Sequence, residues 1–260
     1  MKKWPSFSHR PDAFVYAGAS LQKHWPRLHR GDCEPYPGSE PVRDAWRAFH
    51  QGDFQAAWDK GTHAGPEGCL DAAKSAAACA THLEHDTTRA ASLVKEGAEL
   101  CEKARKALPE HANAHYLLAC CLGRYAQKIS VARALRDGVA SRVKEALDRA
   151  LALEPRHAEA HVALGTYHAE VIAKLGSIVG GLTYGASESQ ALAHYRKAIE
   201  LDRDCAVARI EYARGLTLLD ERNVRQARKL LQEAAKIAPA DASEWLDRER
   251  ARTQLEALAS

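Results

Sequence analysis

Apolar residues recur every three or four positions along most of the chain after residue 40, and charged residues fill the positions between them. That period is typical of amphipathic α-helices that turn one face toward a core. Runs of β-branched residues are scarce, alanine is abundant, and glycine and proline fall mostly where the pattern is interrupted. The sequence therefore predicts an all-α protein. The expected helices are 41–51, 53–63, 67–83, 87–108, 111–128, 130–153, 157–174, 187–201, 205–219, 223–237 and 241–258.

Four helix ends resemble one another, which indicates an internal repeat. They are A-R-K-A-L-P-E-H (104–111), R-A-L-A-L-E-P-R-H (149–157), K-A-I-E-L-D-R-D (197–204) and E-A-A-K-I-A-P-A-D (233–241). Aligned on Pro109, Pro155, Arg203 and Pro239, they recur after 46, 48 and 36 residues. Such internal similarity predicts stacked helical hairpins, because one hairpin alone cannot bury its apolar face.

Each hairpin resembles a tetratricopeptide repeat, a pattern of about 34 residues with small side chains where neighbouring helices approach closely. The matching positions are Leu164-Gly165, Ala191 and Ala198; Ala119, Ala146, Ala150 and Pro155; and Ala213, Ala227, Ala234 and Pro239. A degenerate first unit lies in Q-G-D-F-Q-A-A-W, with Gly52 at its turn. The resemblance implies a right-handed superhelical array over residues 41–240. We expect an irregular arm at 1–40, packed on the array, and a capping helix at 241–260 with a charged outer face.

Two of the repeat spacings exceed 34 residues by 12 and 14, which predicts two long insertions. We place them between the first and second helices of adjacent repeats, at 127–138 and 174–187, on one edge of the array and in contact. The second insertion, K-L-G-S-I-V-G-G-L-T-Y-G-A-S, lacks the G-x-x-x-x-G-K-[ST] pattern of a phosphate loop. Its apolar residues either pack as a structural lid over the mouth of a groove or contact a ligand, peptide or lipid chain directly. They are Ile178, Val179, Leu182 and Tyr184.

The order of these features also resembles the regulator-of-microtubule-dynamics family. The matching segments are C-L-G-R-Y (121–125), the basic insertion 129–142, the helix 146–155, L-G-T-Y (164–167) and the apolar insertion 176–187. The resemblance covers roughly residues 43–240 and implies a helical-repeat protein. No segment matches a transmembrane anchor, so we expect a soluble relative without one. Membrane tethering, microtubule association and lipid transfer are not carried over.

The candidate binding residues are polar side chains at equivalent positions in the first helix of successive repeats. His115, His161 and Arg209 are 46 and 48 positions apart, and stacked repeats expose such positions on a concave face. The expected groove residues are His115, Tyr116, Arg124, His161, His168 and Arg209. The alternative for each of them is packing in the core or on the surface.

Charge and composition restrict the partners. Lys and Arg number 37 against 34 Asp and Glu, so the net charge of +3 indicates no nucleic-acid partner. Residues 1–35 are basic and aromatic and could bind RNA, but their aromatic residues favour an arm tied across the first hairpins: Trp4, Phe7, Phe14 and Trp25. Seven cysteines at irregular spacings indicate free thiols. No stretch predicts a signal peptide or a membrane span, which favours the cytoplasm.

Motifs for metal binding and catalysis are weak. Cys79, His82 and His85 share a helix at spacings of three, but no paired C-x-x-C or H-E-x-x-H supports a metal site. No G-x-S-x-G or S-x-x-K motif is present, so we expect neither an enzyme nor a cofactor. Two functions stay open: a scaffold that binds a protein or peptide in its groove, and a carrier of lipid or another apolar ligand in a cavity roofed by 174–187.

Overall fold

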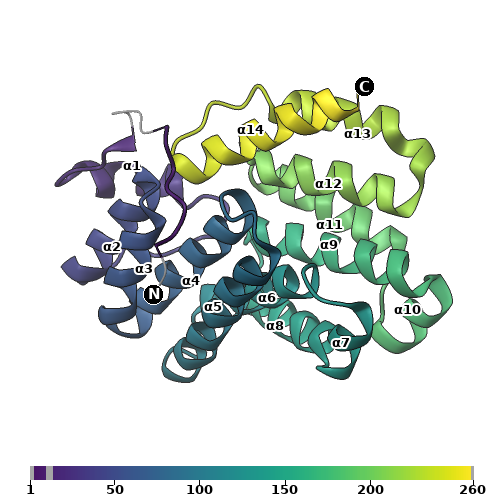
Figure 1. Cartoon of the computed structure of the whole chain (residues 1–260), viewed down its shortest axis with the longest axis horizontal. Helices are drawn as coiled ribbons and strands as arrows, with labels where there is room; N and C mark the ends of the chain where they lie inside the picture. The colour runs from purple at the N-terminus through teal and green to yellow at the C-terminus, as the bar shows by residue number, and fades with distance from the viewer. Residues whose placement is uncertain (1–2, 10–13, 259–260) are drawn as a thin grey trace. The chain divides into compact units, whose positions relative to one another are not determined.

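The computed structural model describes residues 3–9 and 14–258, and the regular structure of these residues is entirely helical (Figure 1). The all-α prediction is thereby confirmed. The elements are α1 (Ser20–Leu28), α2 (Glu40–Gln51), α3 (Phe54–His63), α4 (Gly65–His82), α5 (Thr87–Ala107), α6 (Ala112–Ala126), α7 (Val131–Arg136), α8 (Val139–Leu153), α9 (Ala158–Leu175), α10 (Ser177–Tyr184), α11 (Glu188–Leu201), α12 (Ala206–Leu219), the 3₁₀-helix η2 (Glu221–Asn223), α13 (Val224–Ala234) and α14 (Ala242–Ala257).

Side-chain caps set several helix starts where the sequence pattern predicted them. The backbone N–H of Ala56 donates to the Asp53 carboxylate at 3.1 Å, and that of Arg89 donates to the Asp86 carboxylate at 2.9 Å. The hydroxyl of Ser187 accepts from the N–H of Gln190 at 3.2 Å at the start of α11. These oxygens satisfy N–H groups that have no partner within the helix.

The helices differ from the expected ones in three places. The expected helix 130–153 is divided into α7 and α8 at Gly138, whose φ of 61° places it in the left-handed region that ends a helix. The insertion 174–187 contains the helix α10, and the arm contains α1 although Pro26 lies within it. Trp25 fixes α1 because its buried ring packs edge-on against Trp46 at 5.8 Å between centroids.

The chain divides into two compact units. Unit 1 comprises Met1–His29, Cys33–Glu154 and Ala240–Ser243, and unit 2 comprises Arg30–Asp32, Pro155–Pro239 and Glu244–Ser260. The hairpins α2–α3, α4–α5 and α6–α8 form unit 1, and α9–α11 and α12–α13 form unit 2. We call α2, α4, α6, α9 and α12 the first helices. The division of the chain at residues 40 and 240 stays a prediction.

Both insertions lie inside hairpins, between a first and a second helix, as the repeat spacing predicted. α7 lies between α6 and α8, and α10 lies between α9 and α11. The contact between the two insertions stays a prediction.

Glycine allows a close contact between α3 and α4 in unit 1. A Cβ atom on Gly61 of α3 would lie only 2.5 Å from the carbonyl oxygen of Gly68 in α4. Since a backbone atom cannot move aside as a flexible side chain can, both positions require glycine for this approach. Neither of these glycines was among the positions that matched the repeat pattern in the sequence.

A single tyrosine organises the core of unit 2. Tyr195 of α11 is fully buried, stacks on Tyr212 with 5.1 Å between ring centroids, and donates its hydroxyl to Thr166 Oγ1 at 3.1 Å. Its ring fills the space that Gly165 and Gly215 leave open, since a Cβ on either glycine would lie less than 3 Å from it. Tyr195 thus joins the two first helices of this unit to the second helix between them.

The aromatic side chains of the N-terminal arm are buried in unit 1. Trp4 packs on Trp58 of α3 with 5.5 Å between ring centroids, and the Trp25 indole N–H donates to the carbonyl oxygen of Glu34 at 2.7 Å. Phe7 and Phe14 are buried as well. These contacts tie the described part of residues 1–35 to α3 and to the segment before α2, and the assignment of residues 1–40 as a separate arm stays a prediction.

Candidate functional site

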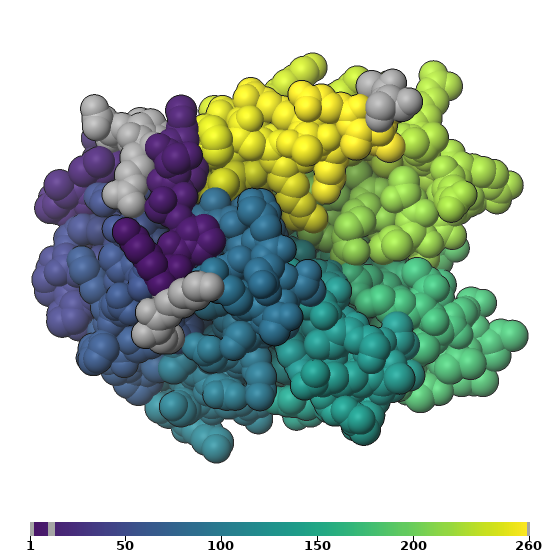
Figure 2. Space-filling model, in the orientation of Figure 1, coloured from purple at the N-terminus to yellow at the C-terminus, as the bar shows by residue number. Residues whose placement is uncertain are grey.

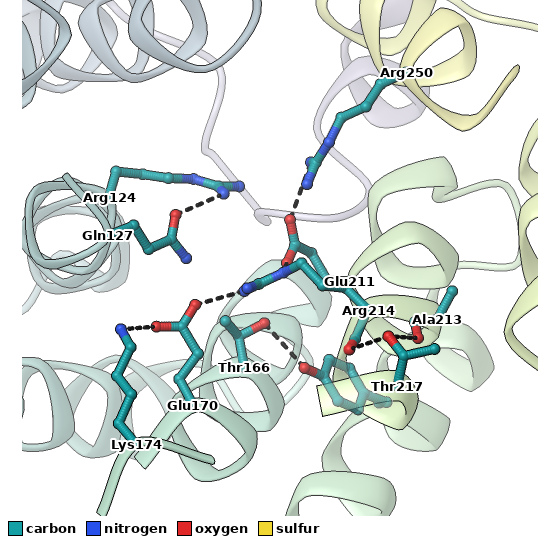
Figure 3. Close-up of polar contacts among 11 residues, drawn as sticks. Arg124, Gln127, Thr166, Glu170, Lys174, Glu211, Ala213, Arg214, Thr217 and Arg250 are labelled. Atoms are coloured by element: carbon teal, nitrogen blue, oxygen red, sulfur yellow. Dashed lines mark hydrogen bonds and ion pairs between the residues drawn. The ribbon is translucent and has the colours of Figure 1, made fainter. Parts of the chain in front are cut away.

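A row of alternating charges crosses the first helices of unit 2 (Figure 3). Lys174 Nζ donates to Glu170 Oε2 at 2.9 Å, and Arg214 Nη2 donates to Glu170 Oε1 at 2.6 Å. Arg214 Nε donates to Glu211 Oε2 at 2.9 Å, and Arg250 Nη1 of α14 donates to Glu211 Oε1 at 3.0 Å. We call these five side chains the ion-pair ladder.

Helical spacing and helix packing together build the ladder. Glu170 and Lys174 are four positions apart on α9, and Glu211 and Arg214 are three apart on α12, so each pair lies on one helix face. α9 packs directly against α12, which brings Arg214 within reach of Glu170. The ladder therefore depends on the stacking of two adjacent repeats.

The ladder is partly shielded from water but not sealed. The Glu211 side chain is 3% exposed, whereas those of Arg214 and Lys174 are 28% and 38% exposed. Burial opposes the charge on Arg214, but Glu211 and Glu170 outweigh it and raise the pKa of the guanidinium. Burial also opposes the charge on Glu170, yet Arg214 and Lys174 outweigh it and lower the pKa of that carboxyl. Both shifts favour the charged forms of Arg214 and Glu170. The ladder contains three basic side chains and two carboxylates.

Two of the predicted groove residues in unit 2, His161 and His168, come together at the contact of α9 with α11. His161 Nδ1 lies 2.8 Å from Nδ1 of His194, a residue that the sequence reasoning missed, and His161 Nε2 lies 3.3 Å from the carbonyl oxygen of Pro155. The His168 ring is fully buried and stacks on His194 at 5.8 Å. A neutral His161 satisfies both contacts when its Nε2–H donates to Pro155 and its Nδ1 accepts from His194.

Acid is expected to weaken unit 2 through His161. Burial, and to a smaller extent Lys197, lowers the pKa of His161 despite the Pro155 carbonyl. A histidine whose folded-state pKa lies below its ordinary value stabilises the fold above pH about 6.5, and this stability is lost as the pH falls toward the folded-state pKa. Urea denaturation of the His161→Gln variant at pH 7 and pH 5 should show a smaller acid loss than the wild type. The exposed His63→Gln variant is the control, and an unchanged loss in His161→Gln would contradict the assignment.

The predicted groove residues of unit 1 make local contacts. His115 Nε2 lies 2.9 Å from the carbonyl oxygen of Pro109, six positions earlier, which is the same contact that His161 makes with Pro155. The ring of Tyr116 is buried, and Arg124 Nη1 donates to Gln127 Oε1 at 3.4 Å. The repeated histidine therefore ties the start of a first helix to the proline turn before it.

Arg209, the last predicted groove residue, faces the second helix of its own repeat. Its guanidinium lies 3.4 Å from the Glu233 carboxylate of α13 and donates to the Cys205 carbonyl oxygen at 3.2 Å. The two partners hold Arg209 between α12 and α13. A role for the six predicted residues in partner binding stays a proposal.

Three of the four predicted lid residues point away from the core. Ile178, Val179 and Leu182 are 75%, 50% and 87% exposed, so they do not pack over the fold. Tyr184 is half-buried, and its carbonyl oxygen accepts from the Tyr167 hydroxyl at 3.0 Å. The aliphatic residues are exposed because Gly180, rather than one of them, lies on the side of α10 that contacts α9.

Other chemistry is limited in the described part of the chain. Within residues 3–9 and 14–258, no three His, Cys, Asp or Glu side chains are placed to share a metal ion. All seven cysteines are free thiols. None of the helices built from these residues is long and apolar enough to cross a membrane.

The sequence model of regulator of microtubule dynamics protein 1-3 matches residues 60–259, which is most of the chain. The chain belongs to this family. Among solved structures it is similar to TTC0263, a thermophilic tetratricopeptide protein of Thermus thermophilus, at 18% identity and a TM-score of 0.57 over 82% of this chain and 97% of that one. That likeness shows a tetratricopeptide-type fold and confirms the predicted helical-repeat array.

A weaker likeness is to YrrB, described as a tetratricopeptide protein with an unusual peptide-binding site. It has 16% identity and a TM-score of 0.40, and the match covers 89% of this chain and all of that one. A comparison with curated protein sequences gives no significant match.

In this family member, sequence reasoning missed the ion-pair ladder. A usable signal was present, because α9 and α12 are otherwise mostly apolar and carry charges at spacings of four and three, Glu170 with Lys174 and Glu211 with Arg214. Identical residue types at equivalent repeat positions do not reveal these pairs, since a ladder needs complementary residues.

The expected outer face of the C-terminal helix is a further correction. The charged outer face expected of this helix comprised Asp247, Arg248, Glu249, Arg250 and Arg252. Only Arg252 is exposed, at 49% of its side chain, and the other four are partly buried. α14 packs on α12 and α13 through Ala251 and Leu255, and the same packing turns Arg250 toward Glu211. The helix covers apolar surface as a cap does, and Arg250 pairs with α12 while Arg248 and Arg252 pair with Glu249 on α14 itself.

Proposed function

We propose that the chain is a non-catalytic helical-repeat scaffold that binds a protein or peptide partner along the first helices of unit 2. The ion-pair ladder supports this proposal. It offers charged groups held in fixed positions and partly shielded from water, on the helices that line the inner face of a tetratricopeptide array.

Preorganisation makes the ladder suitable for recognition. Each of its arginines already has a carboxylate partner, so binding immobilises few additional rotamers. Charges in a partly desolvated site discriminate strongly between partners, because a mismatched group loses its hydration without gaining a partner. The partly exposed edges of Arg214 and Lys174 are the points where a partner can add contacts.

The charges of the ladder favour an acidic partner group. Three cations share two carboxylates, and Arg214 has donor positions beyond the two that its partners use. A carboxylate from a side chain or a chain terminus would supply the third anion. We therefore expect an acidic peptide segment to bind more tightly than its amide counterpart.

The same pairs argue against acid–base catalysis. A general base near neutral pH needs a carboxyl with a raised pKa, whereas Arg214 and Lys174 lower the pKa of Glu170. Glu211 accepts from two guanidinium groups at once. Both carboxylates are thus committed to structural pairs.

The alternative of an apolar-ligand carrier is less well supported. A roof over a cavity requires the aliphatic residues of the second insertion to face inward, but Ile178, Val179 and Leu182 are exposed. A partner bound on the polar face fits the structure better.

A site-specific photo-crosslinking experiment in the native cell tests the proposal. A photoreactive amino acid replaces Thr217, whose hydroxyl donates to the backbone beside Arg214, or Glu200 on the outer helix α11 as the control. We expect one partner to be captured at position 217 and not at position 200. Equal capture at both positions, or recovery of a stoichiometric lipid from the purified protein, would overturn the proposal.

Calorimetry with the captured segment then tests the ladder itself. The Arg214→Lys variant keeps the charge but loses the planar fork, so its affinity should fall about tenfold. Lys197→Ala on α11 is the control and should leave the affinity unchanged. An acidic segment that binds both variants equally well would show that the ladder is not the contact surface.

A further inference from the structure

The exposed aliphatic side chains of the molecule are not scattered. In the described residues, the large apolar side chains with high exposure are Val15, Val131, Leu135, Ile178, Val179, Leu182, Leu218 and Val224. All except Val15 lie within or beside a connection between a first and a second helix, in three successive repeats. Single exposed apolar residues need no explanation, but their concentration in one kind of connection does.

The second insertion is built to present its aliphatic side chains outward. α10 lies between Gly176 and Gly185, whose φ values of 80° and 63° are left-handed. A Cβ on Gly180 would lie 3.2 Å from Val171 Cγ1, so the inner side of α10 is backbone in close contact with α9. The green atoms at the lower right of Figure 2 include this helix at the molecular surface. The contact between Gly180 and α9 fixes the orientation of α10, so the aliphatic side chains of α10 lie on its exposed side.

From these features we infer that α10 is a membrane-contact element, which inserts Ile178, Val179 and Leu182 into the boundary between headgroups and acyl chains of a lipid bilayer. Residues 175–187 contain no charged side chain, so insertion carries no charge into the bilayer. Three aliphatic side chains present on the order of 400 Å². That is well below the roughly 800 Å² that each partner buries in a stable protein complex, whereas a bilayer accepts a few protruding aliphatic groups.

The first insertion, in unit 1, has a basic and aliphatic surface of its own. Residues 128–142 carry four cations against one carboxylate. Arg133 and Arg136 of α7 are 52% and 75% exposed and share Asp137, so their positive charge is only partly neutralised. The exposed Val131 and Leu135 lie on the same short helix. Basic residues interspersed with aliphatic ones suit a surface of anionic lipid headgroups.

Co-sedimentation of the full chain with lipid vesicles tests the inference. We expect binding to vesicles of phosphatidylcholine containing phosphatidylserine, with weaker binding to phosphatidylcholine alone. The variant Ile178→Glu with Leu182→Glu should bind the mixed vesicles at least tenfold more weakly. Because both side chains are exposed, the fold should be unaffected, and the circular dichroism melting curve checks this. Val15→Glu is the matched control, an exposed aliphatic residue outside the connections.

A second pair of variants separates charge from insertion. Arg133→Glu with Arg136→Glu should reduce binding to the mixed vesicles to the level seen with phosphatidylcholine alone. Arg196→Glu with Arg203→Glu makes the same change of charge at exposed positions outside the connections and should have little effect.

Three results would overturn the inference. The first is the absence of vesicle binding by the wild-type chain, and the second is an equal loss of binding in the Val15→Glu control. The third is a wild-type dimer, detected by light scattering, that the Ile178→Glu and Leu182→Glu changes dissociate without changing vesicle binding. In that case the aliphatic face contacts a second copy of the chain. None of these results bears on the proposed peptide scaffold, which depends on the ion-pair ladder.

Discussion

Replacing Tyr195 with alanine is expected to lower the free energy of unfolding by about 3–5 kcal/mol, the range for removing a fully buried aromatic ring. The ring is enclosed by Gly165, Gly215 and Tyr212, and its loss leaves a cavity that three packed helices cannot close. Urea denaturation followed by circular dichroism measures the change. A loss below about 1 kcal/mol would mean that the cavity collapses.

Two companion variants isolate the packing of the ring. Tyr195→Phe removes only the hydrogen bond to Thr166 and should cost about 1 kcal/mol. Gly215→Ala pushes a methyl group into the ring and should cost about 1–3 kcal/mol in the wild type. In the Tyr195→Ala background the same glycine change should cost much less, because the ring that it meets is gone. Additive effects in this double-mutant cycle would contradict the direct contact.

Replacing His50 with alanine is the second change with a large expected effect, a loss of about 3 kcal/mol. His50 is fully buried in α2, and its Nδ1 lies 2.8 Å from Asp241 Oδ2, which is also buried. Burial lowers the pKa of His50, so the ring is neutral near pH 7 and donates from Nδ1 to the carboxylate. The variant leaves a cavity and removes a donor from a buried charge. Hydrogen exchange at residues 240–246 should accelerate more than exchange in α12.

The pH dependence of stability and the His50→Gln variant are the controls for the role of His50. Its folded-state pKa is depressed, so its stabilising effect is present above pH about 6.5 and is lost as the pH falls. The difference in stability between wild type and His50→Ala should therefore shrink between pH 7 and pH 5. His50→Gln retains a donor and should lose less than half as much. A difference that grows on acidification would show that His50 binds a proton in the folded state.

Periodicity in the sequence predicted most helices because amphipathic spacing reflects burial on one side. It also located both insertions, since the flanking helices kept the repeat pattern. It did not predict α10, because a short segment with glycine on one side and aliphatic residues on the other has no polar face. The split at Gly138 depends on a left-handed backbone conformation that an apolar pattern cannot show.

The candidate site was less accessible to sequence reasoning. His115 and His161, which the repeat spacing makes equivalent, share a contact with a proline carbonyl oxygen, and a role for them on a common binding surface stays a proposal. The ladder depends on which helices are neighbours, because Arg214 and Glu170 are 44 positions apart. The inward turn of Arg250 likewise follows from the packing of α14, which one sequence does not reveal.

The packing of residues 240–243 in unit 1 has a consequence for biosynthesis. Tyr16 donates its hydroxyl to the Ala240 carbonyl oxygen, and His50 pairs with Asp241, across 224 and 191 positions of the chain. A nascent chain leaves the ribosome from its N-terminus, so its first hairpins form long before these partners are synthesised. Until residue 241 has been synthesised, His50 lacks its carboxylate. The hairpin that carries His50 therefore reaches its final state only after a later part of the chain has emerged, and a chain stopped before residue 240 would leave it without these two contacts.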